Sequence, residues 1–377
     1  MSKHPDVAVI GGGIIGLSTA YFLAKAGFTV DVLDRSDLGR EASWAGAGII
    51  PPGNPDLAGS PADLLRAIGS ARFPVFSAEL RELTGVNNGY RACGGIEYLH
   101  PCDEYVIPVW QAEGIVFERL TPDELSSLEP GLGAVRGQPY FLPTCAQVRN
   151  PWHLRALIAA CQRAGVQLHP HQPVRQFECE NGRVSGVHVG EGSLVRAGTY
   201  LLTAGAWSGP LLEQLGHAPV VQPVRGQIVL LNSGAPRLSR ILMLGKEYLV
   251  PRGDGRVLVG STEEPEAGFV KVNTEEAVTK LRRLAAHLVP TLADARVETC
   301  WAGLRPGSPD GLPYLGNVPG WENVFVAAGH FRAGVQLSIG TAQVITELFQ
   351  GRATTVPLDP FRLDRIPSTP TKPAFRS

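Results

Sequence analysis

The sequence predicts an α/β (α+β) protein in which one discontinuous, doubly wound domain carries a second, mainly antiparallel β domain. The first observation is a pattern of strand, glycine turn, helix and strand at residues 6–34. The second is the return of buried strands that end in small residues, at 199–208 and at 323–330. The third is that short strands with Pro and Gly turns fill much of the chain between them. A chain of 377 residues is long enough to build two such domains.

The opening pattern contains the residues that a dinucleotide requires. Gly11 permits a tight turn after the first strand, Gly13 lets backbone N–H groups approach a pyrophosphate, and Gly16 lets helix and strand pack closely. The helix begins near Ile14, so its positive end faces the phosphates. Asp34 lies 18 residues after Gly16 and is placed to accept hydrogen bonds from a ribose 2′-OH. A glycine-rich turn that binds nothing is the alternative.

The later elements follow in order along the chain. Residues 41–52 form a loop of small residues, too rich in glycine for a stable helix, that can approach a flat ring closely. A helix is expected to follow with Asn150 as its N-cap and Pro151 at its first position. Residues 222–302 are mostly strand and turn, with one helix near 274–288.

These signals predict two interleaved domains and a tail. The nucleotide-binding domain takes residues 1–85, 145–215 and 303–365. The second domain, built from short strands and assigned to substrate binding, takes residues 86–144 and 216–302. Residues 366–377 form a C-terminal tail.

Composition excludes several classes of function. The formal net charge is −1 and the pI is about 6.8, so no broad basic field indicates nucleic acid or an anionic membrane. No apolar run approaches the roughly 20 residues of a membrane span, and the first strand follows Met1 too closely for a signal peptide. The six cysteines are scattered without C-x-x-C spacing, so we expect thiols of a reducing cytoplasm and no metal site.

Four segments carry a resemblance to a known family, and their order and spacing extend over nearly the whole chain. The chain resembles the D-amino-acid oxidase superfamily of flavoproteins, and within it the glycine oxidases linked to thiamine biosynthesis. The segments are residues 9–16, 203–207, 301–316 (with Gly-Leu-Arg-Pro at 303–306 and Asp-Gly-Leu-Pro-Tyr-Leu-Gly at 310–316), and 328–332 (Ala-Gly-His-Phe-Arg).

The resemblance implies FAD in the crevice at the carboxyl ends of the parallel strands, in a Rossmann-like domain. It assigns the ADP half to the opening motif and a backbone contact with adenine to Val174. The path toward the flavin ring is assigned to Arg35, Ser43 and Gly48. A helix N-terminus after Gly334 would face the flavin edge that gains negative charge on reduction. The full cofactor-binding set is Gly11, Gly13, Ile14, Ile15, Gly16, Asp34, Arg35, Ser43, Gly48, Val174, Ala204, Gly205, Trp207, Gly303, Gly329, His330, Phe331, Arg332 and Gly334.

Three residues are expected to act on the substrate. A guanidinium matches a carboxylate with two charge-assisted hydrogen bonds, and the resemblance gives that role to Arg305. Tyr248 matches a family tyrosine whose hydroxyl also reaches the carboxylate, and Arg332 contacts either substrate or flavin, or only anchors its loop. Structural roles, a salt bridge for Arg305 and sheet packing for Tyr248, remain the alternatives. His330 is interpreted as structural, because direct hydride transfer requires no base.

Two positions depart from the family pattern. Glu263 stands where glycine oxidases often have an apolar side chain, and a carboxylate facing the pocket would disfavour a substrate carboxylate or select a cationic substrate. Related sarcosine oxidases tether the flavin through a cysteine near the Arg305 motif, where this chain has Gly303. Cys300 falls three residues early, so we expect non-covalent FAD.

The activity that follows is oxidative deamination of glycine or a small D- or N-methyl amino acid, by hydride transfer from Cα to flavin N5. The products are an imine, hydrolysed to the 2-oxo acid and ammonia, and hydrogen peroxide from dioxygen. One alternative is a dehydrogenase that passes electrons to a quinone or partner subunit, and a second is a non-catalytic flavin-binding protein. Related enzymes are often homo-oligomers, and the sequence leaves this state open.

Overall fold

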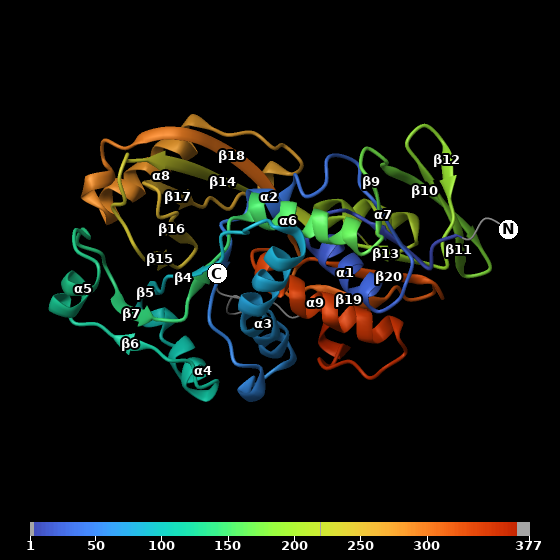
Figure 1. The fold of residues 1–377 in the computed structure, drawn as a ribbon, viewed down its shortest axis with the longest axis horizontal. Helices are drawn as coiled ribbons and strands as arrows, with labels where there is room; N and C mark the ends of the chain where they lie inside the picture. Colours follow the sequence, from blue (N-terminus) through green and yellow to red (C-terminus); the bar gives the residue numbers. More distant parts are fainter. Residues whose placement is uncertain (1–3, 219, 368–377) are drawn as a thin grey trace.

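The computed structural model describes residues 4–218 and 220–367, and its framework is a six-stranded sheet (Figure 1). The sheet is parallel except at β19, which runs antiparallel to β20. Its order is β19 (Tyr314–Asn317), β20 (Val324–Ala328), β13 (Thr199–Leu202), β1 (Val7–Ile10), β2 (Val30–Leu33) and β9 (Gln167–His169). Strands from three separate stretches of the chain therefore lie side by side.

Both faces of this sheet are covered, which explains its apolar strands. Val7 and Val9 of β1 pack among helices α1 (Ile14–Lys25), α3 (Pro61–Thr84), α6 (Asn150–Arg163) and α9 (Gly334–Phe349). Ala8 and Ile10 face the other way, because side chains alternate along a strand. That side is covered by α7 (Ser208–Gln214) and a small antiparallel sheet of β10 (Val174–Glu180), β11 (Arg183–Val189) and β12 (Ser193–Val195).

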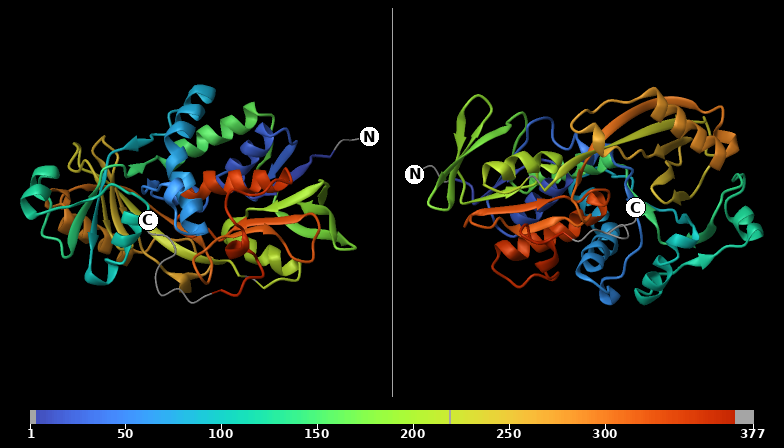
Figure 2. Two further views of the ribbon diagram at one scale, coloured as in Figure 1. Left: turned by 90° about the horizontal axis from the view of Figure 1, so that it is seen from below. Right: turned by 180° about the vertical axis from the view of Figure 1, so that it is seen from behind.

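An eight-stranded sheet lies toward the other end of the molecule from β10–β12 (Figures 1 and 2). Its pairs are antiparallel except β15 with β5, and helix α8 (Glu275–Leu288) packs on one face. Its order is β18 (Arg296–Gly307), β14 (Gln222–Asn232), β17 (Arg256–Gly260), β16 (Glu247–Pro251), β15 (Ile241–Leu244), β5 (Gly95–Leu99), β7 (Gln138–Leu142) and β6 (Glu118–Arg119).

The segment after β2 leads from the first sheet to the second. Ser43 and its neighbours form the one-turn helix α2 (Ala42–Ala45), followed by β3 (Ile49–Ile50). A small antiparallel sheet joins β3 to β8 (Ala146–Gln147) and β4 (Arg91–Ala92). Ala47 and Ile49 pack against the face of the eight-stranded sheet that α8 leaves uncovered.

The fold class is confirmed, while several local expectations are wrong. The stretch 86–144 contains helices α4 (Val106–Ala112) and α5 (Pro122–Leu128) as well as strands. The missed signal for α5 is a capping box, in which the side chains of Thr121 and Glu124 each accept a backbone N–H of the other. The domain boundaries themselves stay a prediction, and most of the tail lies outside the described residues.

The N-cap of α6 is Arg149 rather than Asn150, and Pro151 occupies the second helical position. The reason is a tertiary contact, because the Asn150 amide donates a 2.7 Å hydrogen bond to the carbonyl of Ser43. Asn150 therefore ties α6 to α2 instead of satisfying its own helix end.

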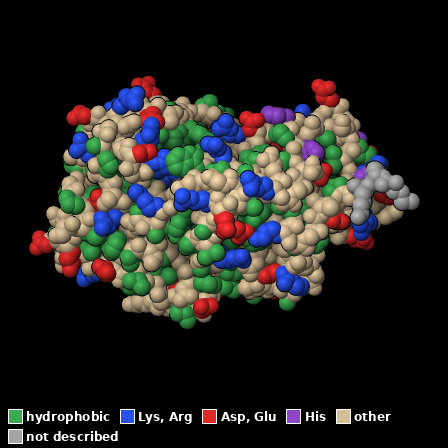
Figure 3. All heavy atoms as spheres, in the orientation of Figure 1, with side chains coloured by type: hydrophobic (Ala, Val, Ile, Leu, Met, Phe, Trp, Pro, Cys, Tyr) green, Lys and Arg blue, Asp and Glu red, His purple; other side chains and the backbone are tan. Residues whose placement is uncertain are grey.

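The surface carries both signs of charge, interspersed over the face seen in Figure 3. None of the helices in the described part of the chain has the length and apolar character to cross a bilayer.

A buried ion pair fixes the last described segment. Arg365 donates to both carboxylate oxygens of Asp310 at 2.7 and 2.8 Å, and its guanidinium lies 3.8 Å from the Tyr314 ring centroid. Burial raises the pKa of Asp310, but the hydrogen bonds and charge of Arg365 outweigh it and hold the pKa below its ordinary value. The pair anchors the turn between β18 and β19.

Arg365→Met leaves the buried Asp310 carboxylate without its cation, so we expect the free energy of unfolding to fall by about 3 kcal/mol or more. Arg362→Met is the matched control, because its partner Asp364 is exposed and no measurable change is expected. Urea denaturation of the two variants checks this. Equal stability of both would show that the buried pair contributes nothing.

Candidate active site

A cavity of about 440 Å³ opens at the carboxyl ends of β1 and β2. It is lined by segments of the glycine turn, α2, the start of β10, the end of β13 and the loop before α9. Of the predicted cofactor-binding residues, it brings together Gly11, Gly13, Ile14, Ile15, Asp34, Arg35, Ser43, Val174, Ala204, Gly205, Trp207, His330, Phe331, Arg332 and Gly334. Gly48 and Gly303 line only a smaller neighbouring cavity, and Gly16 and Gly329 line neither.

In the glycine turn the backbone packs too closely against its neighbours to leave space for side chains. Gly11 has φ +117°, and a Cβ there would lie 2.4 Å from the carbonyl oxygen of Thr203. A Cβ on Gly16 would lie 1.9 Å from the carbonyl oxygen of Gly11. Both positions therefore exclude a side chain, and they hold the start of α1 against the ends of β1 and β13.

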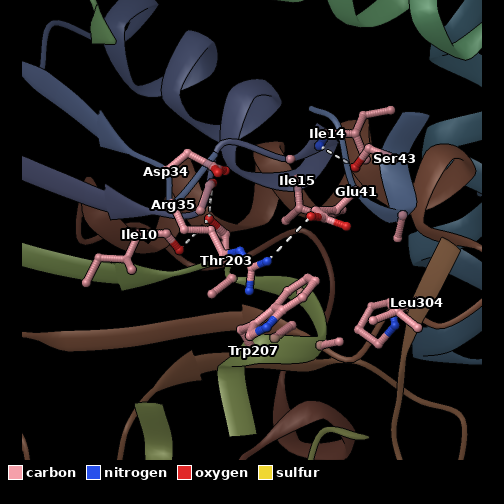
Figure 4. A pocket seen from close by; sticks show the side chains of 18 of the residues that line it. Ile10, Ile14, Ile15, Asp34, Arg35, Glu41, Ser43, Thr203, Trp207 and Leu304 are labelled. Carbon is pink, nitrogen blue, oxygen red and sulfur yellow. Dashed lines mark hydrogen bonds and ion pairs between the residues drawn. The ribbon is translucent and has the colours of Figure 1, made fainter. Parts of the chain in front are cut away.

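The N-terminus of α1 points into the cavity (Figure 4). The Ile14 N–H donates to Ser43 Oγ at 2.9 Å. The first N–H groups of a helix have no partner inside it, so this end can bind an anion.

Asp34 closes the turn from the other side. Its carboxylate accepts the N–H of Gly12 at 2.7 Å and the N–H of Ser36 at 2.8 Å. Burial raises the pKa of Asp34, and those hydrogen bonds from Ser36 and Gly12 oppose the shift. Oδ1 also accepts the Ser36 hydroxyl at 3.2 Å, while Oδ2 retains a second lone pair and can accept from a ligand hydroxyl.

At the outer end of the cavity, Arg35, Trp207 and Glu41 make side-chain contacts that the sequence did not predict. The Arg35 guanidinium lies 3.9 Å from the Trp207 ring centroid and 3.7 Å from Glu41 (Figure 4). Phe269 packs on the same indole, with ring centroids 5.6 Å apart, and Lys271 pairs with Glu41 at 2.6 Å. These two residues lie in the segment between β17 and α8, and no local motif indicates such a contact.

The inner end continues into a smaller cavity of about 70 Å³. Arg305 and Arg332 line both cavities, while Tyr248 lines the smaller one. The other walls are mainly small or apolar and include Ala45, Ala47, Ile49, Ile228 and Val335. The three predicted substrate residues therefore meet at one small space.

Arg305 is held only by neutral groups. Its nitrogens donate to the carbonyl oxygen of Thr262 at 3.1 Å and to Ser261 Oγ at 2.7 Å. The guanidinium crosses Gly226 on the paired strand, where a Cβ would lie 2.1 Å from it. Within residues 4–218 and 220–367 no acidic side chain forms a salt bridge with it.

Arg332 has a different environment. Its Nη2 pairs with Glu263 Oε2 at 3.1 Å, and Glu263 lines neither cavity, so the condition under which its carboxylate would face the pocket is not met. Burial lowers the pKa of Arg332, the nearby Arg305 lowers it further, and Glu263 opposes both. The Nε of Arg332 is buried without a hydrogen-bond partner in the described chain.

His330 lines the large cavity, but it is buried and its ring faces helix α9. Its Nε2 lies 3.0 Å from Thr341 Oγ1, and burial lowers its pKa to about 3. An imidazole with that pKa is neutral at physiological pH and a poor proton acceptor, which supports the structural interpretation. Its neighbours Gly329 (φ +80°) and Phe331 (φ +45°) turn the chain sharply from β20 into α9.

The fold and the cavity together define an enzyme that uses a dinucleotide cofactor at the edge of a parallel sheet. Residues 6–348 match the family DAO, described as FAD dependent oxidoreductase. The chain belongs to this family, and FAD is its cofactor.

Known proteins resemble this chain over most of their own length. The chain is 39% identical to a glycine oxidase of Pseudomonas aeruginosa over 94% of this chain and 97% of that protein. It is 33% identical to the bifunctional protein ThiO/ThiG of Synechocystis sp. over 100% of this chain and 56% of that protein. The crystal structure of glycine oxidase from Geobacillus kaustophilus superposes with a TM-score of 0.89 at 30% identity, covering 97% of this chain and 100% of that one.

The residues present fit FAD. The large cavity runs from the N-terminus of α1 to Arg305, and Gly11 and Gly13 line it, so a pyrophosphate can lie against this helix end. No cysteine lines either cavity in the described residues, and Cys300 packs on the α8 side of its sheet. Across residues 4–218 and 220–367, no group of three or more His, Cys, Asp or Glu side chains could hold a metal ion.

Gly16→Ala forces a Cβ against the Gly11 carbonyl, so we expect FAD affinity to fall by about tenfold or more, because overpacking costs about 1–3 kcal/mol. Gly59→Ala is the control, since a Cβ there meets nothing within 4 Å. Equilibrium dialysis of flavin against both apoproteins measures the difference. Equal affinity would mean that close packing at Gly16 does not shape the site.

Proposed function

We propose that this protein oxidises glycine or a similarly small amino acid, with dioxygen as electron acceptor. The observation that carries the proposal is Arg305, a guanidinium without an acidic partner in the described chain, at a cavity of about 70 Å³ that adjoins the FAD cavity. The names of the relatives, glycine oxidase at 39% and 38% identity, support the same substrate.

The chain's own residues supply binding, orientation and exclusion of water. The Arg305 fork binds the substrate carboxylate, and the Tyr248 hydroxyl gives a second contact from the neighbouring strand pair. Ile49, Ile228 and Val335 restrict the substrate side chain and keep the space around Cα dry. When bound, FAD supplies the two-electron oxidation of the amine.

The proton balance needs no strong base in the protein. A substrate that binds as the free amine loses a hydride equivalent from Cα and a proton from nitrogen, which together amount to two electrons and two protons, and the resulting imine takes water to give the 2-oxo acid and ammonia. Two electrons and two protons reduce dioxygen to hydrogen peroxide. The enclosed, neutral His330 takes no part and holds the loop before α9.

The remaining cofactor contacts follow from the placement of the lining residues. Val174, Ala204 and Gly205 line the outer part of the cavity, where the adenosine half is expected, and Arg35 lies there with Trp207 rather than on the path toward the flavin ring. The N-terminus of α9, at Gly334, faces the inner part and stabilises negative charge there. Among the described residues no cysteine lines either cavity, which supports non-covalent FAD, and six free thiols support a reducing cytoplasm.

The ThiO/ThiG relative supports a role in thiamine biosynthesis, where the imine of glycine would be the useful product. A dehydrogenase that reduces a quinone or a partner subunit shares this site geometry, since acceptor choice depends on access to the flavin.

Anaerobic mixing of the purified yellow protein with glycine, sarcosine, D-alanine and D-proline tests the function. We expect glycine or sarcosine to bleach the flavin absorbance near about 450 nm and air to restore it with hydrogen peroxide formed. Bleaching that air does not reverse would replace the oxidase with the dehydrogenase. No bleaching by any of the four would overturn the proposal.

Arg305→Leu removes the carboxylate's partner, so we expect KM for glycine to rise by roughly 100-fold or more, since losing one side of a desolvated charge pair costs about 3–5 kcal/mol. Arg305→Lys keeps the positive charge but loses the two-pronged guanidinium, so its KM for glycine is expected to lie between those of the wild type and the leucine variant. Steady-state oxygen consumption measures both. An unchanged KM in the leucine variant would remove Arg305 from the substrate site.

A further inference from the structure

The pair of Glu263 and Arg332 stands at the edge of the inner cavity. Arg332 lines both cavities, whereas Glu263 lines neither and contacts the guanidinium through Nη2 at 3.1 Å. The Arg332 side chain is 14% exposed and the Glu263 side chain 30%. The carboxylate therefore lies on the solvent side of the guanidinium.

Two guanidinium groups border this one small space, and only one of them has an acidic partner in the described chain. Arg305 is bound by neutral oxygens of Ser261 and Thr262. Arg332 donates through Nη2 to Glu263 and, at 3.3 Å, to the carbonyl oxygen of Lys246. Its Nε is buried without a partner. One full positive charge is thus left for a ligand.

We propose that Glu263 sets the charge class of the substrate, by neutralising Arg332 so that the site accepts amino acids with a single carboxylate. This inference rests on the proposed function, because it concerns the same substrate site. A second substrate carboxylate near Arg332 would gain little from a guanidinium whose charge Glu263 already balances, and the Glu263 carboxylate would repel it across that guanidinium. Without Glu263, the freed fork of Arg332 would offer a second carboxylate site.

A binding experiment tests this independently of turnover. Acetate and malonate carry one and two carboxylates and no amine, so they bind without being oxidised. Their Kd values are measured from the change in flavin absorbance of the holoenzyme, at constant ionic strength. Glu263→Gln is expected to lower the Kd for malonate by about tenfold, and to change the Kd for acetate by less than about threefold.

Glu266→Gln is the matched control, because it removes the same charge from an exposed position of the same loop and should leave both Kd values unchanged. Glu263→Asp keeps the negative charge and is expected to keep the wild-type ratio of the two Kd values. Retention of FAD and of the unfolding temperature establishes that each variant is folded.

A turnover arm completes the test with glycine and iminodiacetate, which is glycine bearing a second carboxymethyl group. We expect Glu263→Gln to raise the ratio of kcat/KM for iminodiacetate over glycine by about tenfold. An unchanged malonate Kd, or a parallel loss of acetate and malonate binding, would overturn the inference and leave Glu263 as a support for Arg332. Failure of the proposed function would show instead as a wild-type flavin that no amino acid reduces, and the two titrations would still decide the role of Glu263.

Discussion

The charge of Arg305, which has no counter-charge in the described part of the chain, is the constraint around which the site is built. Holding a guanidinium away from water costs several kcal/mol unless something balances it. Within residues 4–218 and 220–367, the guanidinium donates only to Ser261 Oγ and the Thr262 carbonyl oxygen. Arg305 is half-buried at the junction of the two cavities, so a ligand carboxylate bound there would supply the missing counter-charge.

The register of β14 with β18 makes that placement possible. Val224 pairs with Arg305 and Gly226 with Gly303, so the guanidinium can cross the bare backbone of Gly226. Gly303 in turn leaves room for Ala45 of α2, because a Cβ on Gly303 would lie 2.5 Å from the Ala45 Cβ. The two paired glycines therefore have different roles: Gly226 gives space to the Arg305 guanidinium, and Gly303 lets β18 pack against α2. Through the second contact, the eight-stranded sheet lies against the segment that follows the nucleotide-binding motif.

The sequence was most informative where one local motif has one structural outcome. The Gly11 turn, the start of α1 and the position of Asp34 follow from backbone sterics and helix geometry within a single unit. Contacts between distant segments could not be predicted in this way. Phe269 on Trp207 and Lys271 on Glu41 depend on how two sheets meet, and single residues on separate loops give no periodic signal.

Glu263 and Asn150 show the same limit at the site itself. The carboxylate stood out in the sequence, but whether it lines the cavity or pairs with Arg332 depends on the loop after β17. Asn150 has the chemistry of an N-cap, yet its amide is used for the Ser43 carbonyl, because that tertiary contact competes with the helix end. Residue type indicated what each group can do, and packing decided which partner it meets.

The most direct test of the central role of Arg305 is a crystal structure of the FAD-bound protein with acetate. We predict both acetate oxygens within about 2.7–3.2 Å of the Arg305 guanidinium, in the small cavity beside Tyr248. An acetate ion bound elsewhere, with Arg305 still held only by Ser261 and Thr262, would contradict the assignment of this arginine as the carboxylate-binding group.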